Sequence, residues 1–210
     1  MIAPPERSAE RDAVIGALLL RVPTQGWTGV ALRGAIADLG GDPLDAELLF
    51  PGGPADLVEA FIDLFDRRME EEAAAAPDFA ALRTPGKVRA LIVRRLALNR
   101  PHKEAIRRAL AVLAQPGNAT FAARCTARTV DAIWFAAGDR SADFSWYTRR
   151  ATLAAITTAT LLYWLRDISE DDAATHAFLD RRLAGVGRIG RLRRRIEEGC
   201  ARFRPSRQAA

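Results

Sequence analysis

The side chains that most often ligate metals or act as nucleophiles are scarce in this chain. Cysteine occurs only at Cys125 and Cys200, whose separation matches no metal-ligand spacing, and histidine occurs only at His102 and His176. His176 and Asp180 stand four residues apart and can hydrogen-bond on a helix, but no second carboxylate–histidine pair completes a di-iron set. The sequence therefore predicts neither a metal site nor a cofactor.

Residues for acid–base chemistry are also not arranged as a catalytic group. Glu70, Glu71 and Glu72 form a consecutive run, which is typical of a solvated helix face rather than of a paired acid and base. His102 directly follows Pro101 at an expected helix start, where a surface or capping role is favoured over a ligand role. We therefore expect that the protein is not an enzyme.

Arginine accumulates at the C-terminal end of the chain. Residues 181–207 contain ten arginines against two glutamates, a local net charge of +8, so the remainder carries −3 of the total of +5. Apolar residues recur in this region every three or four positions, at Leu183, Val186, Ile189, Leu192, Ile196, Cys200 and Phe203. Most of the arginines between them fall on the opposite arc of a helical wheel.

This pattern is typical of a cationic helix at a membrane surface. It predicts that the tail, residues 188–210, binds anionic lipid reversibly, with Arg188, Arg191 and Arg195 as membrane contacts. The alternative is a helix that packs on the body of the protein and leaves its arginines in solvent.

Apolar residues at helical spacing, interrupted by proline and glycine, predict an all-α fold. No segment shows sustained alternation of apolar and polar residues, so we expect no sheet. The first apolar stripe, Val14 to Val22, is expected to end before Pro23. A long helix is expected over about 144–165, and its uncharged run of 15 residues is too short and too rich in threonine to span a bilayer. These threonines could soften a cavity wall or bond back to the backbone.

Polar residues mark several expected helix starts. Thr28, Asp42 and Asn118 are expected to cap helices, with Pro43 in the favoured first position after Asp42. A boundary near Pro77 is expected to separate an N-terminal bundle, residues 1–76, from a larger helical bundle, residues 77–187. The N-terminus resembles neither a secretory signal nor a transit peptide, because it is acidic and has no long apolar stretch.

The first helices resemble the helix-turn-helix domain of the TetR family of regulators. The matching pieces are GWTGVALRGAIADLGG, DPLDAELLFPGG and PADLVEAFIDLF. Residues 28–60, however, contain one base, Arg33, against six acids, a net charge of −5, and Asp45 and Glu47 stand in the expected recognition helix. Affinity for DNA depends largely on neutralising phosphates with basic residues. We therefore expect a scaffold that has lost DNA reading, and no nucleic-acid partner.

A second resemblance covers most of the chain. The segment AGDRSADFSWYTRRATLAAITTATLLYWLRD, residues 137–167, resembles the signature of the COQ-nine family of ubiquinone biosynthesis. The pieces LFPGG, NRPHKEAIRRALAVLAQPGN, DAIWFAAGD and FLDRRLAGVGRIGR are similar to the same family, in the same order.

The resemblance implies a TetR-like helical bundle, usually a homodimer, that is not known for catalysis. It implies binding of an isoprenoid or quinone lipid and assistance to the di-iron demethoxyubiquinone hydroxylase. The partner-binding residues it implies are Asp143, Trp146, Tyr147 and Arg150. Exposed aromatic rings beside arginine are good interface anchors, although both rings could instead fill the core at a helix start. The expected lipid-binding residues, which could also be core residues, are Trp134, Phe135, Leu153, Ile156, Thr157, Thr160, Leu161 and Trp164.

The sequence thus favours a non-catalytic lipid-binding protein that presents quinone intermediates to the hydroxylase. A ligand-responsive regulator of the TetR type is the alternative, and a purely structural subunit without its own lipid is a third hypothesis. The few lysines and many alanines hint at a bacterium with a GC-rich genome. We expect the protein in the bacterial cytoplasm, peripheral to the inner membrane.

Overall fold

The computed structural model describes residues 4–139 and 145–185, and within these ranges the protein consists of helices and loops without strands. This confirms the all-α class. The helices in chain order are α1 (Ala9–Gln25), α2 (Gly29–Asp38), η1 (Pro43–Asp45), α3 (Ala46–Leu49), α4 (Gly53–Ala75), α5 (Thr84–Asn99), η2 (Arg100–His102), α6 (Lys103–Leu113), η3 (Pro116–Asn118), α7 (Ala119–Ala136), α8 (Ser145–Trp164) and η4 (Glu170–Asp172). A further helix occupies 173–185.

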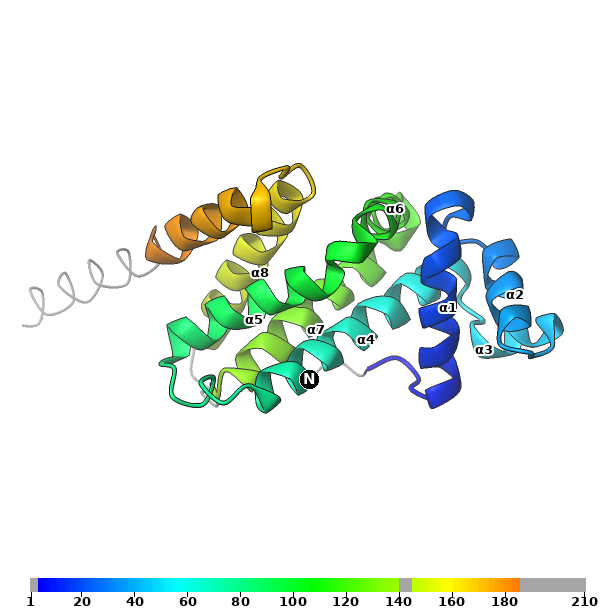
Figure 1. The fold of residues 1–210 in the computed structure, drawn as a ribbon, viewed down its shortest axis with the longest axis horizontal. Helices are drawn as coiled ribbons and strands as arrows, with labels where there is room; N and C mark the ends of the chain where they lie inside the picture. Colours follow the sequence, from blue (N-terminus) through cyan, green and yellow to red (C-terminus); the bar gives the residue numbers. More distant parts are fainter. Residues whose placement is uncertain (1–3, 140–144, 186–210) are drawn as a thin grey trace, which may run out of the picture.

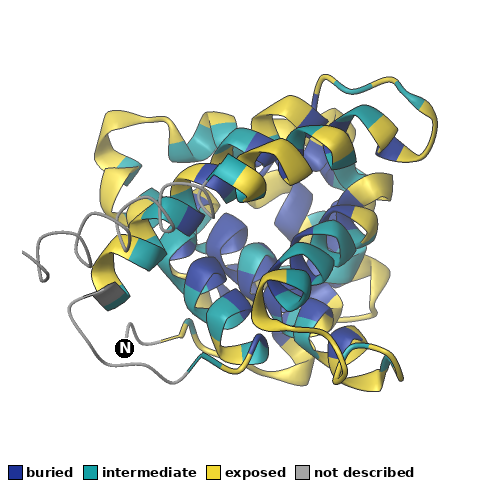
Figure 2. Cartoon of the chain, turned by 90° about the vertical axis from the view of Figure 1, so that its left-hand side faces the viewer, coloured by how far each residue is buried: buried dark blue, intermediate teal, exposed yellow. Residues whose placement is uncertain are grey.

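The molecule is elongated, and α4 runs through its middle (Figure 1). Helices α2 and α3 lie at one end, and the 173–185 helix lies at the opposite end. α4 packs against α1 in the N-terminal part and against α5, α6 and α7 beyond it. Buried apolar residues form one cluster that runs from Val14 to Leu179 without a break near Pro77, and they gather between the helices in Figure 2. The boundary near Pro77 stays a prediction.

Two of the expected caps are confirmed and one is wrong. The Thr28 hydroxyl accepts a hydrogen bond from the Ala31 amide at 3.2 Å, and the Asp42 carboxylate accepts one from the Leu44 amide at 2.9 Å. Asn118 stands at the N-cap position of α7, but its side chain makes no capping hydrogen bond to that helix. Its amide nitrogen instead donates to the carbonyl of Val112 at 2.8 Å, because the last carbonyls of α6 lack helical partners.

The first helix is longer than expected. The stripe from Val14 to Val22 is buried, but α1 continues through Pro23 to Gln25. Proline removes one backbone hydrogen bond, and its exposed ring lies so near the helix end that only two residues follow it. Gly26, at a φ of +72°, then ends the helix.

Buried carboxylates form a stripe along α4, at Glu59, Asp63 and Asp66. Each of them is met by arginine. Glu59 pairs with Arg124 and Arg128 of α7, Asp63 with Arg7 and Arg67, and Asp66 with Arg95 of α5 at 2.6 Å. Asp66 also accepts a hydrogen bond from the Thr129 hydroxyl of α7 at 2.7 Å. Burial raises the pKa of Asp66, so these partners offset a substantial desolvation cost.

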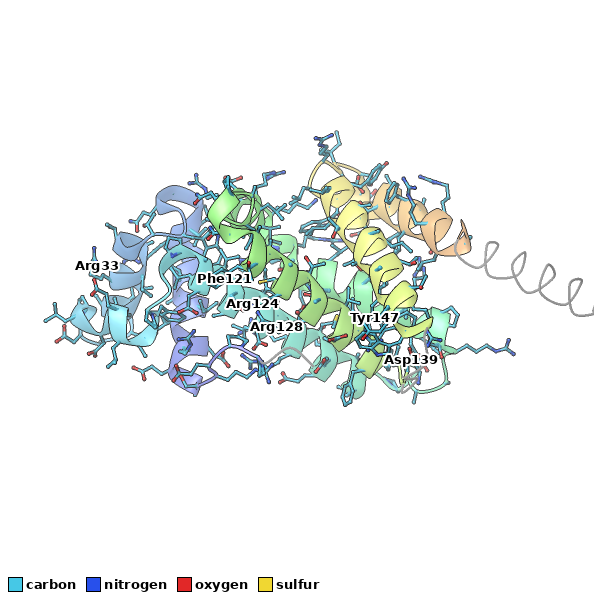
Figure 3. All side chains as sticks on the ribbon, turned by 180° about the vertical axis from the view of Figure 1, so that it is seen from behind. Arg33, Phe121, Arg124, Arg128, Asp139 and Tyr147 are labelled. Atoms are coloured by element: carbon cyan, nitrogen blue, oxygen red, sulfur yellow. The ribbon has the colours of Figure 1, made fainter. Side chains whose placement is uncertain are left out.

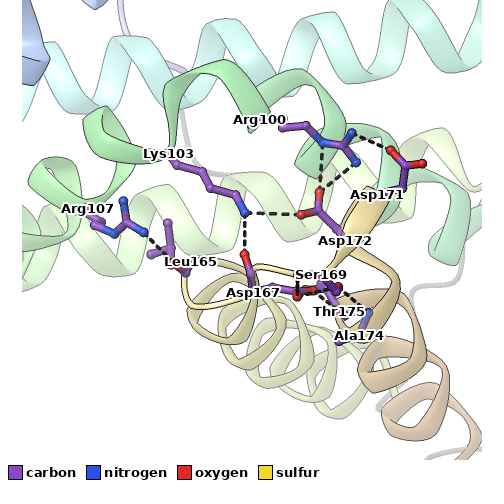
Figure 4. Close-up of polar contacts among 10 residues, drawn as sticks. All are labelled: Arg100, Lys103, Arg107, Leu165, Asp167, Ser169, Asp171, Asp172, Ala174 and Thr175. Atoms are coloured by element: carbon purple, nitrogen blue, oxygen red, sulfur yellow. Dashed lines mark hydrogen bonds and ion pairs between the residues drawn. The ribbon is translucent and has the colours of Figure 1, made fainter.

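The loop after α8 is attached to α6 by basic side chains (Figure 4). The Lys103 ammonium donates to the Asp167 carbonyl at 3.2 Å and the Asp172 carboxylate at 3.3 Å, and lies 4.6 Å from the ring centroid of Trp164. Arg107 donates to the Leu165 carbonyl at 2.6 Å. Positive groups at the C-terminal end of a helix are favoured by its dipole, so these contacts fix the end of α8.

Asp167 then positions the 173–185 helix. Its carboxylate accepts hydrogen bonds from the backbone amides of Ser169 and Thr175, both at 2.8 Å, and from their hydroxyls. Burial alone would raise the pKa of Asp167, but the hydrogen bonds from Ser169 and Thr175 lower it far below its usual range.

We predict that Asp167→Asn lowers the free energy of unfolding by about 2 kcal/mol at pH 7, because hydrogen bonds to a carboxylate are lost. A carboxylate whose pKa is lower in the folded state than in the unfolded state stabilises the fold fully at pH values above its unfolded-state pKa. The difference in free energy of unfolding between the variant and the wild type should therefore shrink as the pH falls below about 4. Urea unfolding at several pH values measures it. Asp180→Asn is the control, since its exposed pair with Arg89 contributes at most about 1 kcal/mol. A difference that is independent of pH, or an equal loss in the control, would contradict this assignment.

Candidate functional site

A groove of about 520 Å³ lies between α7 and α8. Its lining is mostly apolar and small, with Ala122, Ala123, Thr126, Ala127, Val130 and Asp131 from α7, and Trp146, Arg150, Ala151 and Ala154 from α8. The volume is in the range of small-molecule sites in proteins. Because alanine side chains end at Cβ, the two helices leave space between them where larger residues would fill it.

Arg150 is the fixed charge of this groove. Its Nε donates to the Asp131 carboxylate at 2.6 Å, and its guanidinium carbon lies 3.8 Å from the ring centroid of Trp146. The Nη1 atom of Arg150 is buried and has no hydrogen-bond partner among the described residues. A donor of this kind could serve the oxygen of a bound head group, since buried donors are costly when left unpaired.

The two neighbouring aromatic residues at the start of α8 have different surroundings. Trp146 is half-buried in the groove wall, whereas the side chain of Tyr147 is 71% exposed. Their rings meet edge-on, with centroids 4.7 Å apart. Asp139, three residues after the end of α7, pairs with Arg149 of α8 at 3.9 Å, and Figure 3 labels Asp139 and Tyr147. Trp146, Tyr147 and Arg150 are thus together, and Tyr147 is accessible to a partner. Asp143 lies outside the described residues.

The residues expected to bind lipid lie elsewhere than this groove. Leu153, Ile156, Thr160 and Trp164 are buried in the core, and the Thr160 hydroxyl donates back to the Ile156 carbonyl at 2.7 Å. Trp134, Thr157 and Leu161 are partly buried, and Trp134 and Leu161 pack against the core. The expectation that Phe135 could be core is wrong, because its side chain is 75% exposed. Their roles in lipid binding stay predictions.

Sequence reasoning missed the alanines that line the groove. Ala122, Ala123 and Ala127 give no distinctive signal, because alanine is common in any helix of this composition. Ala123 and Ala127 are four residues apart, and Ala151 and Ala154 are three apart on the facing helix, so each pair shares one helix face; this is the pattern that could have indicated small residues facing one another.

Reactive groups near the groove are few. Cys125 is buried on the core side of α7, and burial raises the pKa of its thiol to about 11, so the thiol is protonated at neutral pH. His102 stands at the N-cap position of α6 without a capping hydrogen bond, and its ring packs edge-on against Phe65. Within the described part of the chain, no cluster of three or more histidine, cysteine, aspartate or glutamate side chains could hold a metal ion.

The expected membrane contacts Arg188, Arg191 and Arg195 lie outside the described residues. Among the residues that are described, no helix has both the length and the apolar character needed to cross a bilayer.

Comparison with solved structures identifies the fold. The TetR transcriptional regulator from Nitrosomonas europaea superimposes with a TM-score of 0.68 at 25% sequence identity, over 84% of this chain and 97% of that one. The expected TetR-like fold is therefore confirmed.

Comparison with protein families shows which proteins this chain is similar to in sequence. The family model described as COQ9 matches residues 119–190, which include both helices of the groove. The mitochondrial ubiquinone biosynthesis proteins COQ9 of Drosophila melanogaster and Homo sapiens are 35% and 30% identical, over 83% and 88% of this chain. This chain spans 54% and 59% of their lengths.

The fission yeast relative gives the most complete match of these. Ubiquinone biosynthesis protein coq9, mitochondrial, of Schizosaccharomyces pombe is 31% identical over 192 residues, which cover 91% of this chain and 75% of the relative. Identity at this level over most of both sequences shows common descent, and this chain belongs to the COQ9 family.

Proposed function

We propose that this protein is a non-catalytic accessory protein of ubiquinone biosynthesis. In this proposal it binds an isoprenoid quinone intermediate and presents it to the di-iron demethoxyubiquinone hydroxylase. The observation that carries the proposal is the apolar groove between α7 and α8, which lies within the part of the chain matched by the COQ9 family model.

The groove suits an apolar chain that ends in a polar head. Alanine and valine side chains offer a wall without hydrogen-bonding groups, and Arg150 supplies one buried donor at its side. Burial of about 200 Å² of isoprenoid surface would contribute roughly 5 kcal/mol, at about 25 cal/mol per Å². Leu153 and Ile156 are buried in the core and anchor α8 on the side away from the groove.

The alternative of a TetR-type regulator is supported by the fold alone. It requires a basic surface on η1 and α3, where Asp45 and Glu47 are exposed. Acidic side chains there would repel the phosphate backbone of DNA, and we therefore propose lipid presentation and not DNA binding.

Filling the groove should remove the lipid. We predict that Ala154→Phe, which projects a ring into the groove, lowers co-purifying isoprenoid lipid about tenfold or more, equivalent to at least 1.4 kcal/mol. Native mass spectrometry and organic extraction of the purified protein measure this. Ala155→Phe is the matched control, because Ala155 is exposed and does not line the groove. Absence of lipid from the wild type in several expression hosts, or an equal loss of lipid in both variants, would contradict the proposal.

The partner surface is tested at Tyr147. We predict that Tyr147→Lys weakens binding of the hydroxylase at least about 30-fold, as expected for an aromatic anchor worth 2 kcal/mol or more. Its melting temperature should stay close to the wild type, because the side chain is 71% exposed. Ile168→Lys is the control, since Ile168 is fully exposed beyond the other end of α8. Unchanged affinity, or unfolding of the Tyr147 variant, would show that this ring is not an interface anchor.

The basic tail is proposed to hold the protein on the cytoplasmic face of the inner membrane. Replacing Arg188, Arg191 and Arg195 with glutamine should abolish salt-sensitive binding to phosphatidylglycerol vesicles, because each arginine contributes about 1 kcal/mol near an anionic surface. Vesicle co-sedimentation measures it. The control replaces Arg33, Arg83 and Arg166, three exposed arginines elsewhere. Equal binding to neutral phosphatidylcholine vesicles, or equal loss in the control, would count against the tail as the membrane contact.

A further inference from the structure

The segment that would read DNA in a regulator presents leucines to solvent. Leu44 of η1 and Leu48 of α3 are 84% and 79% exposed and stand four residues apart. Between them Asp45 and Glu47 are also exposed. We call these four residues the leucine–acid face. Large apolar side chains in an exposed group of this kind mark interaction sites more often than scattered ones do.

The segment is held in this orientation from behind. Arg11 of α1 is buried, pairs with Asp56 at 3.0 Å, and donates to the Leu49 carbonyl at the end of α3. Its guanidinium carbon also lies 4.2 Å from the ring centroid of Phe50. These contacts fix the C-terminal end of α3 to the bundle, so the face cannot bury its leucines by a small rotation.

Three of the six acids in residues 28–60 are paired with arginines, and the two acids of this face are not among them. Asp38 pairs with Arg21 at 2.8 Å, Asp56 with Arg11, and Glu59 with two arginines of α7. The net charge of −5 over residues 28–60 therefore overstates the exposed negative charge, because arginines outside that range neutralise half of the six acids. Asp45 and Glu47 have no ion pair within the described chain, so the free negative charge lies beside the leucines.

A partner for this face must carry positive charge and aliphatic groups together. Nucleic acids and anionic membranes are repelled, whereas a peptide segment with arginines and aliphatic residues at spacings of three and four matches both features. The chain itself contains such a segment. Residues 186–207 hold eight arginines against two glutamates, with Ile189, Leu192 and Ile196 among them.

The positions of the described elements favour binding of the segment from a second copy over binding of the chain's own segment. α3 lies at one end of the molecule, and the 173–185 helix, from which the segment continues, lies at the other (Figure 1). A depression of about 470 Å³ adjoins the face, with Glu47 at its edge and Leu32, Phe50 and Leu57 among its lining residues. It offers room for one apolar side chain of the incoming segment.

We propose that the leucine–acid face binds the arginine-rich segment 186–207 of a second copy of this chain. The contact joins two different surfaces of the chain, so two antiparallel copies can make it reciprocally in a two-fold dimer, or successive copies can make it head-to-tail. The arginines of this segment are also the proposed membrane contacts, so the two contacts compete, and the test therefore contains no lipid.

Photo-cross-linking locates the contact directly. A benzoylphenylalanine placed at Leu48 of the full chain is irradiated in an equimolar mixture of unlabelled and ¹⁵N-labelled protein. We expect cross-links from residue 48 to peptides of 186–207, with mixed-label pairs at the statistical share. Cross-links confined to single-label pairs, or to other parts of the chain, would overturn the proposal.

A charge exchange tests the chemistry. Asp45→Arg with Glu47→Arg should lower the cross-link yield about tenfold, since two exposed ion pairs are replaced by repulsion. Adding Arg191→Glu and Arg195→Glu to the same chain should restore it. Glu10→Arg with Glu71→Arg is the control, with an equal change of charge at exposed sites elsewhere, and should leave the yield unchanged. Failure of the exchange to restore the yield, or equal loss in the control, would contradict the assigned contact.

Discussion

The buried carboxylates of α4, and the arginines that reach them from other helices, constrain the rest of the molecule. A carboxylate taken out of water is costly, and removing one partner of a buried pair typically costs about 3–5 kcal/mol. Glu59 and Asp66 can therefore be buried only where α7 brings Arg124, Arg128 and Thr129, and α5 brings Arg95. Figure 3 shows Arg124 and Arg128 along α7. Because these pairs fix the core-facing side of α7, its opposite side, with the small residues, is free to line the groove against α8.

Much of the fold follows from local sequence chemistry, and the groove does not. The caps at Thr28 and Asp42 were predictable, because capping side chains act on residues next to them, and the extent of α8 followed from its long apolar run. The continuation of α1 through Pro23 was not, because a helix end depends on whether the ring meets solvent or another helix. The family resemblance named Trp146 and Arg150 as site residues but not their contact, whereas the groove wall at Ala123 and Ala127 depends on which face of α7 the buried ion pairs select. A cavity is a property of packing between elements, and alanine leaves no signal of it in a single sequence.

The N-terminal helices have the arrangement of a TetR-type DNA-binding domain, but their exposed side chains differ in chemistry. TetR-like topology is kept, with α1 and α4 holding α3 outward through Arg11, while the exposed chemistry of α3 is acidic and aliphatic. The fold thus specifies where a partner can dock, and the exposed side chains specify which kind of partner it is. The two ends of this molecule carry opposite features, acids with leucines at one and the start of an arginine-rich segment at the other. Between them lies the groove within the region that matches the COQ9 family model.

An isoprenoid quinone is proposed to occupy the space between α7 and α8. Hydrogen–deuterium exchange of the full chain, with and without a short-tailed ubiquinone, locates the ligand without reference to activity. We expect slower exchange at backbone amides of residues 122–131 and 146–154, which contain all the lining residues, with little change in α2 and α3. Protection confined to the N-terminal bundle, or no protection at saturating quinone, would contradict it.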